Sequence, residues 1–206
     1  MIIGIDFDNT MVSYDRLAAV AAKRRNLIPE AFPENKTRVR DYLRAIGREA
    51  DWTRLQSEIY GEMICEAEPF PGVRSFLELG HRKNWTLCIV SHKTSRPYGG
   101  GDVNLRLHAL NWLEHHRFLD SSETGLTRPH VFFEETKAEK MARIGSLKCD
   151  WFIDDLPELL LEPGFPPSPQ KILFDPQNQH PDHEAFQRCR HWDHMMSLIQ
   201  NRGQDL

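Results

Sequence analysis

Apolar residues recur along the chain in two alternating patterns. Short runs, mostly of β-branched or aromatic residues, predict buried strands: one begins at Ile2, and others lie at residues 85–90, 131–133, 151–153 and 172–174. Between them, apolar residues recur every three or four positions, as in amphipathic helices, and a last helix is expected from about residue 181 to 199. Strands that alternate with helices predict an α/β fold with a doubly wound parallel sheet.

Residues 13–68 follow a different pattern from the rest of the chain. Three short amphipathic helices are predicted there, with no convincing strand between them. Each of these helices can bury only one face, and without strands they cannot belong to the sheet. The simplest account is a small helical domain inserted after the first strand. We therefore expect a core formed by residues 1–12 and 69–206, interrupted by a helical insertion at residues 13–68.

Polar side chains follow four of the predicted strands. They are carboxylates, a hydroxyl and lysines: Asp6, Asp8, Ser91, Lys137, Lys140, Asp154 and Asp155. The carboxyl ends of parallel strands share one edge of a sheet, so we expect these groups to converge. Carboxylates from two strands, with a main-chain carbonyl, form a hard oxygen site that suits Mg²⁺. A lysine and a hydroxyl beside it suit a phosphate group, which one carboxylate can attack while another moves a proton.

These residues also resemble a known family. Asp6-Phe7-Asp8-Asn9-Thr10, Ser91, Lys137 and Asp154-Asp155 are similar, in this order, to the four motifs of the haloacid dehalogenase (HAD) superfamily of phosphatases. The segment Pro71-Gly72-Val73 before the second strand also resembles that family. The resemblance covers the Rossmann-like core, roughly residues 1–12 and 70–175, and the insertion resembles the small α-helical cap of the family.

The resemblance implies different roles for the first two aspartates. Asp6 would be the nucleophile that forms an aspartyl-phosphate. Asp8 would be the general acid for the leaving alcohol and then the base for water. The dehalogenases of the family lack an acid at this position and its ATPases usually carry threonine, so Asp8 favours a phosphatase or a phosphomutase.

The resemblance also implies a metal site. Asp6, the main-chain carbonyl of Asp8, and Asp154 would hold Mg²⁺. Asp155 would be a further ligand through water, or would hold Lys137. The expected metal-binding residues are therefore Asp6, Asp8, Asp154 and Asp155.

Two lysines could supply the positive charge beside the phosphoryl group. Lys137 is expected at the start of a helix, where Thr136 and Glu139 fit a capping box, and Lys140 lies one turn later. We prefer Lys137 as the catalytic lysine because anions bind at helix N-termini. The alternative is that both lysines are solvent-exposed and that Arg128 supplies the charge.

Four further residues are expected to bind the substrate. By the resemblance, the hydroxyls of Thr10 and Ser91 would contact the phosphoryl oxygens. His92 and Lys93 follow Ser91 directly, and loops at the carboxyl edge of such a sheet carry specificity.

Taken together, these features indicate a Mg²⁺-dependent phosphohydrolase that acts on small phosphomonoesters through an aspartyl-phosphate. A phosphomutase or phosphotransferase with the same residues remains open, because either water or a second hydroxyl could accept the phosphoryl group. A non-catalytic regulatory domain of the same fold is a further alternative. Loss of Asp6, Asp8 or the acidic pair would favour it, and all of these residues are present.

Composition narrows the expected partners and location. The net charge is −4 without a basic block, which argues against a nucleic-acid partner. The apolar runs are too short to span a membrane, and the chain begins directly with a strand, so we expect no signal peptide. The cysteines are far apart and include no CxxC pair. We expect a cytoplasmic protein with a small phosphorylated substrate.

Overall fold

The computed structural model describes residues 1–97 and 102–202. Within these residues, six strands form a parallel sheet in the order β5-β4-β1-β6-β7-β8. The strands are β1 (Ile2–Ile5), β4 (Thr86–His92), β5 (Val131–Glu134), β6 (Trp151–Asp154), β7 (Gln170–Phe174) and β8 (Gln187–Cys189). Because successive strands are added on both sides of β1, the predicted doubly wound, Rossmann-like α/β fold is confirmed.

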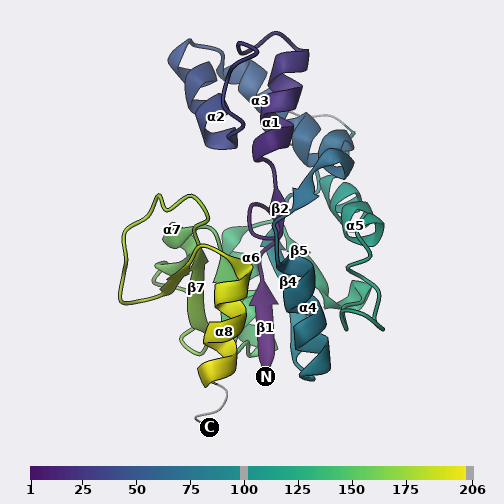
Figure 1. Ribbon diagram of the computed structural model, residues 1–206, viewed down its shortest axis with the longest axis vertical. Coiled ribbons are helices and arrows are strands. Elements are labelled where there is room, and N and C mark those ends of the chain that lie inside the picture. The colour runs from purple at the N-terminus through teal and green to yellow at the C-terminus, as the bar shows by residue number, and fades with distance from the viewer. Residues whose placement is uncertain (98–101, 203–206) are drawn as a thin grey trace. The chain divides into compact units, whose positions relative to one another are not determined.

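Helices cover both faces of this sheet. They are α4 (Val73–Arg82), α6 (Lys137–Leu147), α7 (Pro157–Leu160) and α8 (Trp192–Arg202), with a short 3₁₀ turn η2 (Arg128–His130). Alternate residues of β4 point to opposite faces, so they meet different helices. Cys88 and Val90 pack with Ile144 of α6, whereas Leu87 lies against Gly80 of α4 on the other face. Helix α8 packs beside α4 on that second face (Figure 1).

By their contacts, the residues divide into two units. The core unit comprises residues 1–11, 69–93 and 117–206, and the helical unit comprises residues 12–68 and 94–116. The helical unit holds α1 (Asp15–Arg24), α2 (Lys36–Ala45), α3 (Glu49–Tyr60), the 3₁₀ turn η1 (Glu62–Glu66) and α5 (Leu105–His115). The short strands β2 (Val12–Ser13) and β3 (Glu68–Pro69) pair with each other where the chain passes between the units.

Helix α5 belongs with the helical unit. Residues 94–116 are expected from the sequence to belong to the core, but α5 packs against η1 and α3. The indole N–H of Trp112 donates a 2.8 Å hydrogen bond to the carbonyl oxygen of Ala67. The amphipathic pattern of α5 shows that one face is buried, but not which element buries it.

The last helix begins later than the sequence analysis expects. Residues 187–189 form strand β8 beside β7, and α8 starts only at Trp192. Between the two strands, Asp175 accepts hydrogen bonds from the backbone N–H groups of Gln179 and His180, which shapes a loop. The expected helix start at Pro181 is therefore wrong, because local side-chain bonds shape this polar segment as a loop.

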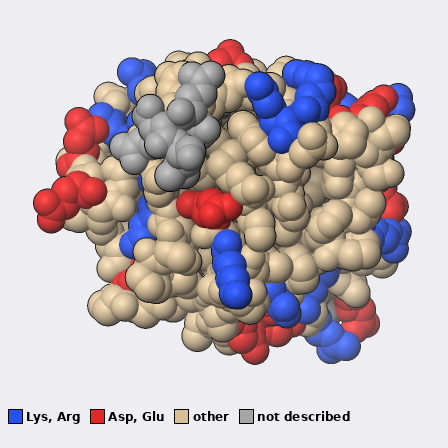
Figure 2. Space-filling view, turned by 90° about the horizontal axis from the view of Figure 1, so that it is seen from below, with Lys and Arg blue, Asp and Glu red and all other residues tan. Residues whose placement is uncertain are grey.

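The described surface is mixed in charge. Figure 2 shows Lys and Arg side chains interspersed with Asp and Glu on the face it draws. Across the described residues, no helix combines the length and apolarity needed to cross a membrane. All four cysteines are free thiols, and three of them are buried.

Glycine at position 4 lets β1 lie close to its neighbours. A Cβ atom added at Gly4 would lie 2.6 Å from Cδ2 of Phe152 and 3.1 Å from Sγ of Cys149. Real Cβ atoms do not approach other heavy atoms to 2.6 Å, so one of these groups would have to shift. Because β1 leads directly into Asp6, this close packing also positions the polar groups at its end.

We predict that Gly4→Ala destabilises the protein by about 1–3 kcal/mol, the usual cost of overpacking a core. Chemical denaturation followed by circular dichroism measures the effect. Gly164→Ala is the matched control, since its added Cβ would lie at an ordinary van der Waals distance, 3.7 Å, from Cε of Met141. Equal stabilities for the two variants would contradict this account of β1.

Candidate active site

The register of β1 and β6 brings two aspartates to the same level of the sheet. Ile5 pairs with Ile153, and the N–H of Asp6 donates a 2.8 Å hydrogen bond to the carbonyl oxygen of Ile153. Asp6 therefore continues β1 beside Asp154, the last residue of β6, and Asp155 follows directly. The predicted convergence of these two strand ends is what the structure shows.

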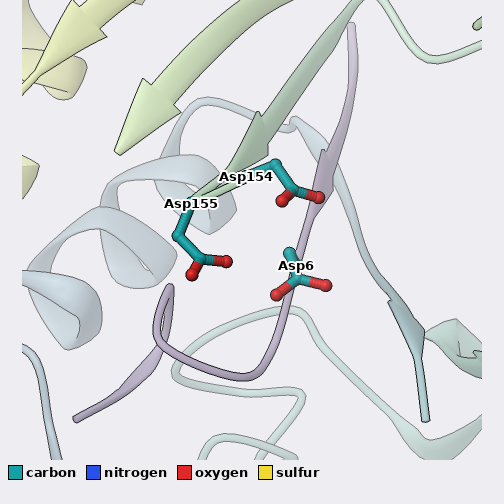
Figure 3. Close-up of side chains that lie close together, drawn as sticks. All are labelled: Asp6, Asp154 and Asp155. Carbon is teal, nitrogen blue, oxygen red and sulfur yellow. The ribbon is translucent and has the colours of Figure 1, made fainter. Parts of the chain in front are cut away.

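Three carboxylates form what we call the acidic cluster: Asp6, Asp154 and Asp155. One oxygen of each lies within 4.8 Å of the others, and Figure 3 shows the side chains directed toward a common space. Asp6 and Asp154 are buried, and Asp155 is partly exposed. The hydroxyl oxygen of Thr10, itself buried, lies 3.5 Å from an oxygen of Asp6 and 3.5 Å from one of Asp155.

A buried lysine on α6 joins two members of the acidic cluster. Nζ of Lys140 donates 2.6 Å hydrogen bonds to Oδ1 of Asp6 and to Oδ2 of Asp154. Only 2% of the Lys140 side chain is exposed, and its ammonium also lies 5.5 Å from the ring centre of Phe152. A charged lysine is rarely buried unless it is paired, so these contacts explain its position.

The preference for Lys137 is corrected by this geometry. The predicted capping box is present: Thr136 and Glu139 exchange hydrogen bonds at the start of α6. The cap leaves Lys137 exposed in the first turn, whereas Lys140, one turn later, is on the face that packs against the sheet. The expected pairing of Asp155 with Lys137 is likewise not seen, and Lys140 instead bonds the other two aspartates.

A tight turn carries Asp8 out of the strand. The N–H of Met11 donates to the carbonyl oxygen of Phe7 over 3.0 Å, and Asn9 adopts a left-handed conformation with φ of 57°. Asparagine tolerates this region better than most residues. Among the described residues, the acidic cluster does not include the Asp8 carboxylate.

Lys93 pairs with Asp8. Its Nζ donates to both carboxylate oxygens of Asp8, each over 2.9 Å. The side chain of Lys93 is 3% exposed and that of Asp8 is 20% exposed. Two lysines thus serve different aspartates: Lys140 contacts the acidic cluster, and Lys93 contacts Asp8.

Ser91 and His92 lie at the end of β4. Ser91 is buried and pairs with Phe133 of β5 in the sheet. The ring nitrogen Nε2 of His92 lies 2.9 Å from the main-chain oxygen of Glu135. This contact directs the His92 ring toward the segment after β5.

Burial and neighbouring charges shift the proton affinities of the site. Burial raises the pKa of Asp6 to about 7; the ammonium of Lys140 opposes this shift, and the charges of Asp154 and Asp8 add to it. Burial alone would lower the pKa of Lys140, but the carboxylates of Asp154 and Asp6 outweigh it and raise the pKa above its ordinary value. The ammonium of Lys140 and the carboxylate of Asp6 therefore each stabilise the charged form of the other.

The donor set fits a divalent cation. When all groups are charged, the acidic cluster and Asp8 carry two more charges than Lys93 and Lys140 compensate. A divalent ion would supply the missing positive charge, and Mg²⁺ prefers carboxylate oxygens. Asp6, Asp154 and Asp155 are the side chains that could hold it.

Sequence reasoning missed the pairing of Lys93 with Asp8. It placed Lys93 only as a residue that lines the substrate site. The available signal was its position two residues after Ser91, on the strand adjacent to β1, because parallel neighbours end at the same edge. The sequence does not indicate which lysine faces which aspartate.

The chain is similar in structure to known proteins but has little sequence similarity to them. No family model and no curated protein sequence matches the chain. A HAD-superfamily hydrolase of subfamily IA from Geobacter sulfurreducens is 12% identical, with a TM-score of 0.58 over 96% of this chain and 95% of that one.

Two further solved structures are similar over nearly their whole length. A haloacid dehalogenase-like hydrolase from Xanthomonas campestris is 12% identical, with a TM-score of 0.55, and the match covers 98% of this chain and 95% of that one. A HAD-superfamily hydrolase from Ehrlichia chaffeensis is 13% identical, with a TM-score of 0.53 and coverage of 97% and 96%. The chain therefore has the fold of solved HAD-superfamily hydrolases.

Proposed function

We propose that the protein is a Mg²⁺-dependent phosphohydrolase of the HAD superfamily that acts on small phosphomonoesters through a phosphorylated Asp6. The observation that carries this proposal is the separation of two carboxylates. Asp6 belongs to a buried acidic cluster bonded to Lys140, whereas Asp8 lies outside the cluster and pairs with Lys93. Neighbouring carboxylates in different environments can take different roles in acid–base and nucleophilic chemistry.

Asp6, Asp154 and the main-chain carbonyl of Asp8 would hold Mg²⁺, with Asp155 as a further ligand through water. When bound, the ion would offset negative charge on the phosphoryl group and on the acidic cluster. Lys140 would remain beside Asp6 and Asp154, where its positive charge opposes the rise that burial causes in the pKa of Asp6.

Asp6 is oriented for attack on phosphorus. Its Oδ1 accepts the 2.6 Å hydrogen bond from Lys140, and its Oδ2 lies 3.5 Å from the hydroxyl of Thr10. We assign Oδ2 as the attacking atom because it makes the weaker contact. A bond forms from this oxygen to phosphorus, the ester P–O bond breaks, and the leaving alcohol takes a proton from Asp8.

Hydrolysis of the phosphorylated Asp6 completes the reaction. Asp8, now ionised, removes a proton from a water molecule, which attacks phosphorus and releases inorganic phosphate. This step regenerates Asp6 and returns a proton to Asp8. The hydroxyls of Thr10 and Ser91 would contact the phosphoryl oxygens, and the helical unit would act as the cap that selects the leaving group. A second hydroxyl in place of water would give a phosphomutase or phosphotransferase.

Activity should require a divalent cation. We expect hydrolysis of a panel of small phosphomonoesters with Mg²⁺, loss of activity in excess EDTA, and recovery when Mg²⁺ is added in excess over the chelator. The physical reason is the uncompensated negative charge of the acidic cluster. Phosphate release measures the rate, and full turnover in excess EDTA would contradict the metal requirement.

The two aspartates should respond differently to removal of charge. Asp6→Asn should abolish turnover, because an amide is not a nucleophile. Asp8→Asn should slow the hydrolysis of alkyl phosphates by roughly 10²–10⁴-fold, the usual contribution of general acid–base catalysis. Single-turnover rates of the first step should fall less for aryl phosphates, whose leaving groups need less protonation. Steady turnover by Asp6→Asn would overturn the assignment.

Lys140 should stabilise the protein when no metal is bound. Lys140→Met leaves Asp6 and Asp154 as neighbouring buried carboxylates, so we expect a loss of about 3–5 kcal/mol in metal-free buffer. Added Mg²⁺ should raise the Tm of this variant more than that of the wild type. Lys137→Met is the matched control and should change stability by less than about 0.5 kcal/mol, because Lys137 is exposed. An unchanged stability for Lys140→Met would contradict the geometry of the site.

A further inference from the structure

The Asp8 carboxylate is held by an ion pair that the proposed reaction does not itself explain. Both of its oxygens accept hydrogen bonds from Lys93 over 2.9 Å. A single ammonium that bonds both oxygens restricts rotation of the carboxylate more than one hydrogen bond would. Asp8 lies in a turn after β1, and its side chain is 20% exposed.

Lys93 is itself fixed in place. Its backbone N–H donates to the carbonyl oxygen of Glu134 over 2.9 Å, so the lysine extends the pairing of β4 with β5. The ring centre of Phe7 lies 5.3 Å from its Nζ, and 97% of the side chain is removed from solvent. A lysine this restrained can determine where its partner carboxylate lies.

The position imposed on Asp8 is close to the acidic cluster but outside it. The charge of Asp8 is near enough to Asp6 to raise the pKa of that residue. Nevertheless, among the described residues, the group of carboxylates whose oxygens all lie within 4.8 Å of one another comprises Asp6, Asp154 and Asp155 and does not include Asp8. A fourth carboxylate beside a cation site is a potential ligand of the cation, so contacts that hold it elsewhere affect the ligand number.

We propose that Lys93 is a positioning residue that keeps the Asp8 carboxylate from becoming a ligand of the metal held by the acidic cluster. This inference rests on the proposed function for the presence of that metal. Because Lys93 holds Asp8 away from the metal, the carboxyl group of Asp8 is available to exchange a proton with the leaving group and with water. Lys93 also limits the site to three carboxylates, a number that suits Mg²⁺, which keeps several waters, better than Ca²⁺, which takes more oxygen ligands.

Metal titration tests this role without any turnover. The wild type and Lys93→Met, both stripped of metal with EDTA and dialysed, are titrated by calorimetry with MgCl₂ and, separately, with CaCl₂. Lys93→Met should bind Mg²⁺ about tenfold more tightly, because one positive charge near the site is removed. Its affinity for Ca²⁺ should rise by a larger factor, because Asp8 becomes an additional ligand.

Two further variants separate positioning from other effects. Asp8→Asn combined with Lys93→Met should lose the additional gain for Ca²⁺, since the fourth carboxylate is absent. Lys171→Met is the matched control: its Nζ donates to the carbonyl oxygen of Leu160 over 2.6 Å and lies 4.4 Å from the ring centre of Phe165. Lys171 is near the start of β7, at the opposite edge of the sheet from Asp8, so its removal should leave both affinities unchanged.

The outcomes are distinct. Equal gains in affinity for Mg²⁺ and Ca²⁺ in Lys93→Met would mean that the substitution removed only a charge. Unchanged or weaker binding would mean that Lys93 is merely structural. Either result overturns the inference about Lys93 but leaves the proposed function intact. Failure of the wild type to bind either ion overturns both this inference and the proposed function. Should circular dichroism show that Lys93→Met is unfolded, Lys93→Gln, which also lacks the charge, is titrated and judged in the same way.

Discussion

Two carboxylates buried side by side, those of Asp6 and Asp154, are the constraint on which the rest of the site depends. They lie at the ends of adjacent parallel strands, and each accepts a 2.6 Å hydrogen bond from the buried ammonium of Lys140. Without that lysine or a bound cation, the two charges would repel each other where little solvent can screen them. Lys140 supplies one positive charge and Lys93 another, and the negative charge that remains would suit a divalent ion.

The sequence predicts most of the core of the fold because its signals are local. Apolar runs that begin at Ile2 and at residues 85, 131, 151 and 172 are the strands β1, β4, β5, β6 and β7, since a strand buried on both faces is apolar throughout. Strand β8 was missed because it is short, and Cys189 is its only buried residue. Contacts between distant elements are not local, so the association of α5 with the helical unit could not be predicted from its own amphipathic pattern.

In the candidate site, too, some features are predictable from the sequence and others depend on contacts between distant elements. The meeting of Asp6, Asp154 and Asp155 follows from topology, because the ends of parallel strands share one edge. The choice between Lys137 and Lys140 depends on which face of α6 meets the sheet. A capping box fixes where a helix starts, but only packing determines the face it buries. Proximity to the N-terminus of α6 was therefore the wrong criterion for selecting the lysine.

The central claim is that Asp6 carries the phosphoryl group during the reaction. In Asp8→Asn, attack by Asp6 can still occur with an aryl phosphate, whereas hydrolysis of the intermediate lacks its base, so the intermediate should accumulate. The measurement is intact mass spectrometry of this variant after acid quenching during turnover, followed by peptide mapping. The account predicts the added mass of one phosphoryl group, located on Asp6. Turnover without any phosphorylated protein, or a phosphoryl group on another residue, would contradict it.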